Sequence, residues 1–176
     1  PMFLMYRDDA HHTAVALRLG VKHLMVGVHE ATILDGGVCS NAGLDPGEKS
    51  VKYGFTLECG QHEDPESPEV GYRAILNALA FLGITASPAP EPASDYELLS
   101  MYDVHDRAHA DDSFSRAWAS FDKLTKGDHI GTRHDGTKVL AEEDGYILFP
   151  DAKALPGNEW FYVARARPHG EPASPM

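Results

Sequence analysis

The stretch that decides the fold is FTLECGQHEDPESPEVGYRAILNALAFLGI, residues 55–84. Its start is a short apolar run that reaches Glu58, which is typical of a buried strand. Apolar residues then recur at helical spacing, and Gly83 ends the pattern. The residues of this apolar face are Val70, Ile75, Leu76, Leu79, Ala80 and Leu82. We predict a strand over 53–57 and a helix over 65–82.

The sequence before this stretch alternates between strands and a helix. Residues 2–6 and 23–28 are apolar runs of strand length, and residues 10–19 predict an amphipathic helix with Asp8 or Asp9 as its N-cap. Residues 34–50 are rich in Gly, Asp and Ser and predict a loop, or a loop with a short helix. The order of elements predicts an α/β domain over residues 1–85 that is part of a doubly wound sheet.

The composition changes after residue 85. The sequence TASPAPEPASD at 85–95 cannot hold a helix or a central strand, so we predict a Pro-rich linker over 86–96. Short strand patterns follow, separated by turn sequences at 126–128, 135–136 and 144–145. We predict a small β-rich domain, barrel-like or sandwich-like, over 97–166, and a disordered tail over 167–176.

The whole-chain composition excludes some partners. The net charge of −12 argues against nucleic acid and anionic membranes, which need clustered Lys and Arg. Cys39 and Cys59 are too few for a disulfide framework and fit a reducing cytoplasm, where we expect the protein to be located. No apolar run approaches the roughly 20 residues that span a bilayer.

Glu58 is the candidate catalytic residue. A carboxylate at the C-terminal edge of a parallel sheet lies where α/β folds bind ligands. Emerging from an apolar strand into a cleft, it can act as a general base. The alternative is a structural role, in which Glu58 caps the strand end or pairs with Arg73.

Residues 55–84 resemble a signature stretch of the succinylglutamate desuccinylase/aspartoacylase family of zinc-dependent deacylases. PMFLMYRDDA…LRLGVKHLMVG resembles the region upstream of that stretch, and GDHIGTRHDGTKVLAEEDGYILFP resembles the family's small β domain. The resemblance covers most of residues 2–165 and concerns the C-terminal half of the family. It implies a zinc-carboxypeptidase-like sheet, a zinc cofactor, Glu58 as catalytic residue, and hydrolysis of amide bonds in small N-acyl amino acids or related amines.

The resemblance also implies substrate-binding roles for Glu159 and Tyr162, which match the spacing of a family motif in the β domain. The alternative for Tyr162 is an aromatic side chain packed between sheets. The family's zinc ligands precede the part that matches Pro1, and no His-x-x-Glu pair occurs in this chain. We therefore expect this chain to hold no zinc by itself and to be inactive alone. The family's substrate-contacting Tyr and Arg have no counterpart in residues 44–49, where only Lys49 is basic.

Three other readings stay open. His105 and His109 could form a metal pair if their segment were helical, but a solvated loop is the simpler interpretation. Lys138 lies in a hairpin pattern like that of lipoyl or biotinyl carrier domains. The chain could also be a non-catalytic remnant that serves as a binding or assembly module.

Because a sheet cut before its first strands leaves an open edge, we expect the chain to form homo-oligomers or to pair with a missing N-terminal half.

Overall fold

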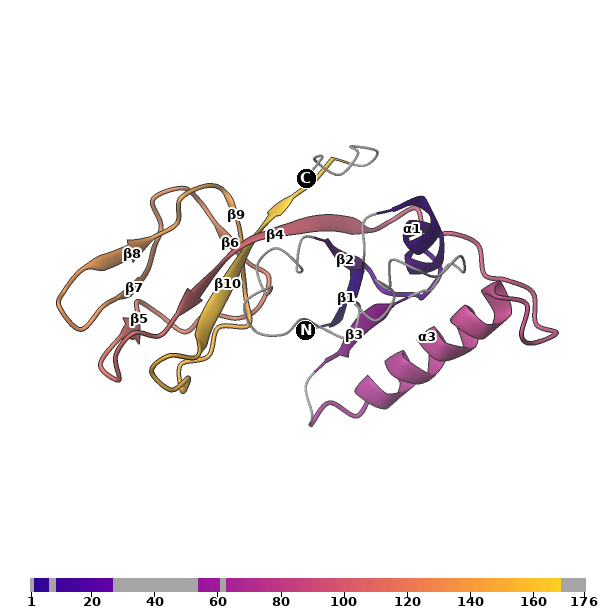
Figure 1. The fold of residues 1–176 in the computed structure, drawn as a ribbon, viewed down its shortest axis with the longest axis horizontal. Coiled ribbons are helices and arrows are strands. Elements are labelled where there is room, and N and C mark those ends of the chain that lie inside the picture. The colour runs from indigo at the N-terminus through magenta and orange to yellow at the C-terminus, as the bar shows by residue number, and fades with distance from the viewer. Residues whose placement is uncertain (1, 7–8, 27–53, 61–62, 169–176) are drawn as a thin grey trace, which may run out of the picture. The chain divides into compact units, whose positions relative to one another are not determined.

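The computed structural model of the chain describes residues 2–6, 9–26, 54–60 and 63–168 (Figure 1). The chain divides into two compact units: a first unit of residues 1–100 and 167–176, and a second unit of residues 101–166. The boundary falls within strand β4 (Glu97–Asp106), whereas the sequence placed it in a linker over 86–96. Residues 86–96 belong to the first unit, where the backbone N–H of Ala93 donates to the carbonyl of Leu17 at 2.7 Å.

The first unit contains strands in the order β3-β1-β2-β4, with β1 at Met2–Tyr6, β2 at His23–Val26 and β3 at Phe55–Cys59. β1 is parallel to β2, and β2 is parallel to β4. β3, however, runs antiparallel to β1, so Phe55 lies opposite Tyr6 and Cys59 lies opposite Met2. The sheet is therefore mixed, and the prediction that Glu58 lies at the C-terminal edge of a parallel sheet is wrong.

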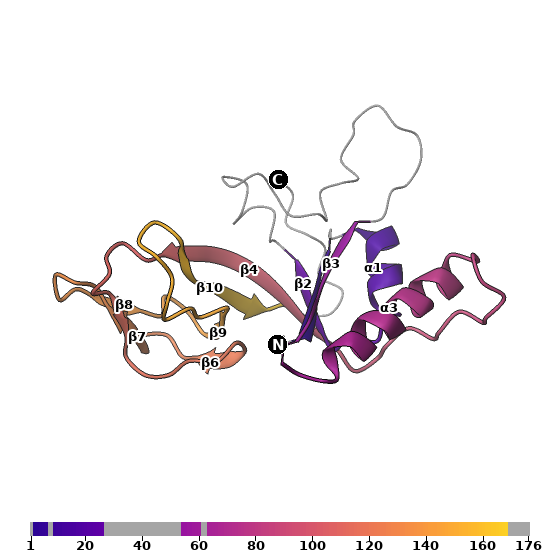
Figure 2. The same ribbon diagram turned by 90° about the horizontal axis from the view of Figure 1, so that it is seen from below.

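Two helices pack on this sheet. α1 (Ala10–Ala16) begins at the predicted N-cap, since the carboxylate of Asp9 accepts hydrogen bonds from the backbone N–H groups of His11 and His12. α3 spans Ser67–Phe81. Both helices contribute to one apolar cluster and lie on the same side of the strands (Figure 2). The described residues thus show helical cover on one face, not the two faces of a doubly wound sheet.

α3 packs mainly through a different side from the predicted apolar face, of which Ala80 is buried. Its small residues Ala74 and Ala78, with Phe81, contact the core of the first unit. Two large side chains of the predicted apolar face point to solvent, with exposed fractions of 60% at Ile75 and 43% at Leu76. Tyr72 lies beside them and is 58% exposed. α3 is therefore apolar on two sides, and the small-residue side is the one that approaches the sheet. Neither α1 nor α3 is long and apolar enough to cross a membrane.

The second unit is β-rich, as predicted. One sheet has the order β4-β10-β9-β6 and the other the order β5-β7-β8. Their side chains share one core, in which Ile147, Trp160 and Phe161 are almost fully buried. The bounds of these strands are Ser113–Phe114 for β5, Asp122–Leu124 for β6, His129–Thr132 for β7, Lys138–Leu140 for β8, Gly145–Leu148 for β9 and Glu159–Ala166 for β10.

The predicted turn sequences coincide with the connections between these strands. Gly127 and Gly136 have φ values of 90° and 87°, a region that favours glycine. Gly145 is required for a different reason, because a Cβ there would lie 2.3 Å from the carbonyl oxygen of Ala164 on β10. The third turn sequence therefore also marks a close contact between two strands.

Candidate functional site

Glu58 lies at the fourth of the five positions of β3, and its side chain is half-buried. Alternation along the strand separates its neighbours into two sets. Phe55 and Leu57 pack against the core cluster that includes both helices. A Cβ added at Gly71 of α3 would lie 3.3 Å from the Sγ atom of Cys59, which places Cys59 on the same side. Glu58 therefore points to the face of β3 away from α3.

Thr56 shares that face with Glu58. Its hydroxyl oxygen is buried and, within the described part of the chain, has no hydrogen-bond partner. A buried hydroxyl without a partner is unfavourable, and such groups often mark a place where water or a ligand binds. Nothing in the sequence singled out Thr56, although period-two alternation from Glu58 identifies it as the neighbouring residue on that face.

Arg73 does not take the structural role with Glu58 that the sequence left open. Its Nε atom donates to Oε1 of Glu69, one turn earlier on α3, at 2.7 Å. Both side chains of this pair are largely exposed. Arg73 is therefore engaged along its own helix.

The start of β3 is tied to α1 by a buried histidine. His12 is 4% exposed, and its Nδ1 atom lies 2.9 Å from the carboxylate of Asp9. Its Nε2 atom accepts a hydrogen bond from the backbone N–H of Gly54 at 3.4 Å. Since Nε2 accepts, Nδ1 carries the proton and donates to Asp9. This chain of contacts holds the residue that immediately precedes β3.

The direction of β3 places Glu58 away from the predicted edge of the sheet. Because β3 is antiparallel to β1, its C-terminal end lies beside the start of β1, where Glu58 is opposite Phe3. Glu58 is thus not at the carboxyl edge of the parallel strands, as the sequence argument assumed. Gly60, which follows β3, has a φ of 124°, a value in the region that favours glycine.

Glu159 and Tyr162 both lie on β10 in the second unit. Glu159 is the first residue of the strand and is exposed. Tyr162 is half-buried, with its ring edge-on to Phe149 at a centroid distance of 5.9 Å. A separation of three residues places the two side chains on opposite faces of the strand. The substrate-binding roles of both residues therefore remain predictions that the resemblance implies.

The histidine pair at 105 and 109 does not form a helical face. His105 is in β4, where it stacks on Phe161 at 4.5 Å and burial lowers its pKa. His109 lies after the strand and stacks on His134 at 4.4 Å. Among the described residues, no group of three or more His, Cys, Asp or Glu could hold a metal ion.

The position of Lys138 does not match that of a carrier-domain lysine. Lys138 is the first residue of β8, beyond the Asp135-Gly136 turn, and pairs with Thr132. It is therefore not at the hairpin tip, where a carrier domain presents its lysine. Cys39 and Lys49 lie outside the described residues.

Asp112 organises the loops of the second unit. Its side chain has no exposed surface and accepts hydrogen bonds from Arg133 at 2.9 Å and from the backbone N–H groups of Ala108, His109 and His134. Burial alone would raise the pKa of Asp112, but these hydrogen bonds to the charged form outweigh it. The pKa of Asp112 lies well below its usual range.

No family model and no curated protein matches the chain, but solved structures do. Succinylglutamate desuccinylase from Vibrio cholerae matches with a TM-score of 0.67 at 16% identity, over 97% of this chain and 51% of that chain. A succinylglutamate desuccinylase/aspartoacylase from Rhodobacter sphaeroides gives 0.65 at 17% identity, with 95% and 54% covered. The product-bound ectoine utilization protein EutE (DoeB) from Ruegeria pomeroyi gives 0.67 at 14% identity, with 93% and 53% covered.

These identities are low, so the likeness is one of fold. The chain spans about half the length of each of these structures. Across that span, it has the fold of succinylglutamate desuccinylase/aspartoacylase family structures, as the sequence resemblance implied.

Proposed function

We propose that this chain is part of a hydrolase that cleaves amide bonds in small N-acyl amino acids or related amines. The observation that carries the proposal is the position of Glu58 within the shared fold: a half-buried carboxylate on the face of β3 away from α3. In this role Glu58 takes a proton from the attacking water and returns it to the leaving amine. Thr56, on the same face, offers a hydroxyl that can orient that water or the substrate.

Zinc enters the proposal through the sequence resemblance alone. A catalytic zinc site uses three protein ligands, and the described residues do not provide such a set. By the sequence resemblance, ligands upstream of the part that matches Pro1 would hold the ion, which would lower the pKa of its bound water. The substrate-binding roles of Glu159 and Tyr162 enter the proposal only through the sequence resemblance.

The proposal can be tested on two polypeptides. One is the chain itself, and the other is the chain extended by the sequence encoded upstream of Pro1. Both are assayed with a panel of N-acetyl and N-succinyl amino acids in the presence of zinc. We expect hydrolysis by the extended polypeptide and none by the chain alone. If neither the extended polypeptide nor the chain hydrolyses any member of the panel, the proposal fails.

A second candidate function is that of a non-catalytic assembly module. The observation that favours it is the exposed stripe of α3, formed by Tyr72, Ile75 and Leu76. Contiguous apolar surface of this kind commonly marks a contact with another protein. If the stripe mediates assembly, Ile75→Lys reduces self-association in light scattering, while Arg73→Lys, a change on the same helix, leaves it unaltered.

A further inference from the structure

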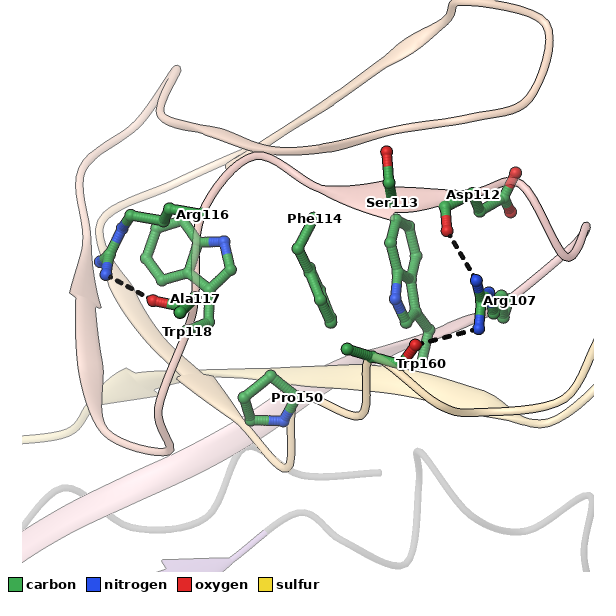
Figure 3. A pocket seen from close by; sticks show the side chains of 10 residues that line it. Arg107, Asp112, Ser113, Phe114, Arg116, Ala117, Trp118, Pro150 and Trp160 are labelled. Atoms are coloured by element: carbon green, nitrogen blue, oxygen red, sulfur yellow. Dashed lines mark hydrogen bonds between the residues drawn. The ribbon is translucent and has the colours of Figure 1, made fainter.

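The second unit contains a pocket of about 430 Å³ that none of the predicted roles uses. Its volume is in the range of small-ligand sites, which is roughly 300–1,000 Å³. Figure 3 shows Arg116 and Trp118 at one end of the pocket, Arg107 at the other, and Phe114 and Trp160 between them. Both tryptophans of the chain contribute to its lining.

The aromatic side chains that line the pocket are flat and held in place. Phe114 stacks on Trp160 with ring centroids 4.6 Å apart. The indole N–H of Trp118 donates to the carbonyl of Ile130 at 3.0 Å, which fixes the orientation of that ring. Pro150 completes the lining below these aromatic rings (Figure 3). Rigid aromatic walls of this kind suit the flat faces of proline rings, as in domains that bind polyproline II segments.

Arginine side chains lie at both ends of the pocket (Figure 3). Arg107 donates from its two terminal nitrogens to the backbone carbonyls of Ala110, Asp112, Ala152 and Ala154. Its Nε atom is buried and has no hydrogen-bond partner among the described residues. The guanidinium of Arg116 lies 3.5 Å above the Trp118 ring and is 52% exposed, with Asp122 as its ion-pair partner. Asp112 also lines the pocket, but its carboxylate is paired with Arg133, so the half-exposed guanidinium of Arg116 favours an acidic group on a ligand.

One segment of the chain has the matching chemistry. Residues 85–95, TASPAPEPASD, carry three prolines at alternate positions, two carboxylates and no basic residue. Residues 88–93 form neither helix nor strand, and Pro88, Glu91 and Pro92 are exposed. Such a sequence favours an extended polyproline II conformation and loses little conformational entropy on binding.

We propose that the pocket of one copy binds the proline-rich segment 85–95 of a second copy. The proline rings would pack against Phe114, Trp118 and Pro150, and Glu91 would lie against the guanidinium of Arg116. This contact is independent of the hydrolase proposed above, because it uses neither Glu58 nor Tyr162.

The first test is a titration of the full chain, carrying Pro88→Ala, Pro90→Ala and Pro92→Ala, with a peptide of residues 85–95. These substitutions remove the competing segment from the chain itself. Because both tryptophans line the pocket, tryptophan fluorescence reports binding directly. We expect a saturable change with a dissociation constant below about 1 mM, and none with a peptide whose prolines are replaced by alanine. No saturable change with the native peptide, or an equal change with the alanine peptide, overturns the proposal.

Arg116→Glu and Arg165→Glu form a matched pair of variants. Each arginine is about half exposed, pairs with a carboxylate and lies over an aromatic ring, but only Arg116 lines the pocket. We expect Arg116→Glu to weaken peptide binding about tenfold, as loss of one charge-assisted contact does, and Arg165→Glu to leave it unchanged. Equal effects of the two substitutions contradict the assignment.

A last arm tests whether the occupant is a second copy. In the unmodified chain, sedimentation should show self-association that Arg116→Glu weakens and Arg165→Glu does not. Tighter binding of a peptide of residues 168–176, PHGEPASPM, than of residues 85–95 would show that the pocket prefers a different segment and would overturn the assignment. Circular dichroism of each variant confirms that the fold is retained.

Discussion

Thr56 and Glu58 share one face of β3, and it is the face turned away from α3. Glu58 is half-buried, and the hydroxyl of Thr56 is buried without a hydrogen-bond partner in the described chain. An ordinary structural strand would place apolar residues at such positions. The pair is therefore the feature of the first unit that most resembles a site.

The stability of a Thr56→Val variant tests whether the hydroxyl of Thr56 has a structural role. The substitution keeps the β-branched shape and removes a buried group that lacks a partner, so we expect the chain to gain roughly 1–3 kcal/mol in free energy of unfolding. Thr132→Val is the matched control, because the hydroxyl of Thr132 is hydrogen-bonded to Nε2 of His129 at 3.0 Å. That variant should lose about 0.5–1.5 kcal/mol. Urea unfolding of both variants measures this, and a destabilised Thr56→Val chain would mean that the hydroxyl has a structural partner.

Asp112 should make the second unit sensitive to acid. Its pKa is depressed in the folded state, whereas in the unfolded chain it is about 3.9. The unfolded state therefore takes up the proton first as the pH falls, and the stabilisation present above about pH 4 is progressively lost below it. Asp112→Asn should lower the melting temperature at pH 7 and flatten its dependence on pH between about 2 and 4. A variant with the same acid dependence as the natural chain would show that another group controls this transition.

Tyr162 tests whether the second unit contributes to a site. If its hydroxyl contacts substrate, Tyr162→Phe costs about 0.5–1.5 kcal/mol in kcat/KM, or up to ~3 with a charged partner, and leaves the melting temperature nearly unchanged. Tyr162→Ala should in either case destabilise the fold by about 3–5 kcal/mol, since the ring packs against Phe149. The assay uses the polypeptide extended upstream of Pro1. Full activity of the Phe variant would remove Tyr162 from the site.

The zinc content of the purified chain tests whether the chain binds the metal by itself. Because the sequence has no His-x-x-Glu pair, we expect the purified chain to carry well under one zinc per molecule. Elemental analysis after dialysis against a weak chelator measures this. Stoichiometric zinc that survives dialysis would show that the chain holds the metal with ligands of its own.

The sequence predicted the elements of the fold better than their orientation. The strand before Glu58, the helix that ends before Gly83 and the turns at Gly127 and Gly136 are all present. Local patterns determine such features, since capping, periodicity and turn residues act over a few positions. Pattern alone could not show that β3 runs antiparallel to β1, because the long connection between β2 and β3 is compatible with either direction.

The buried side of α3 could not be predicted from local pattern either. Periodicity identified a stripe that includes Ile75 and Leu76, but the opposite side, with Ala74 and Ala78, is also apolar. Which of two apolar stripes is buried depends on how closely helix and sheet approach, and small residues allow the closer approach. The pocket lined by Arg107 and Trp118 likewise brings together positions that are separated in sequence, so no local pattern could have predicted it.

The central claim concerns Glu58 and is tested most directly by Glu58→Gln in the extended polypeptide. The amide keeps the shape of the side chain and removes its ability to accept a proton, so we expect kcat to fall by at least ~10²-fold with zinc content unchanged. Glu69→Gln, which changes the exposed carboxylate paired with Arg73, is the control and should keep full activity. If the Glu58→Gln polypeptide retains activity within a few-fold of the unmodified one, Glu58 is structural and the proposed hydrolase mechanism is wrong.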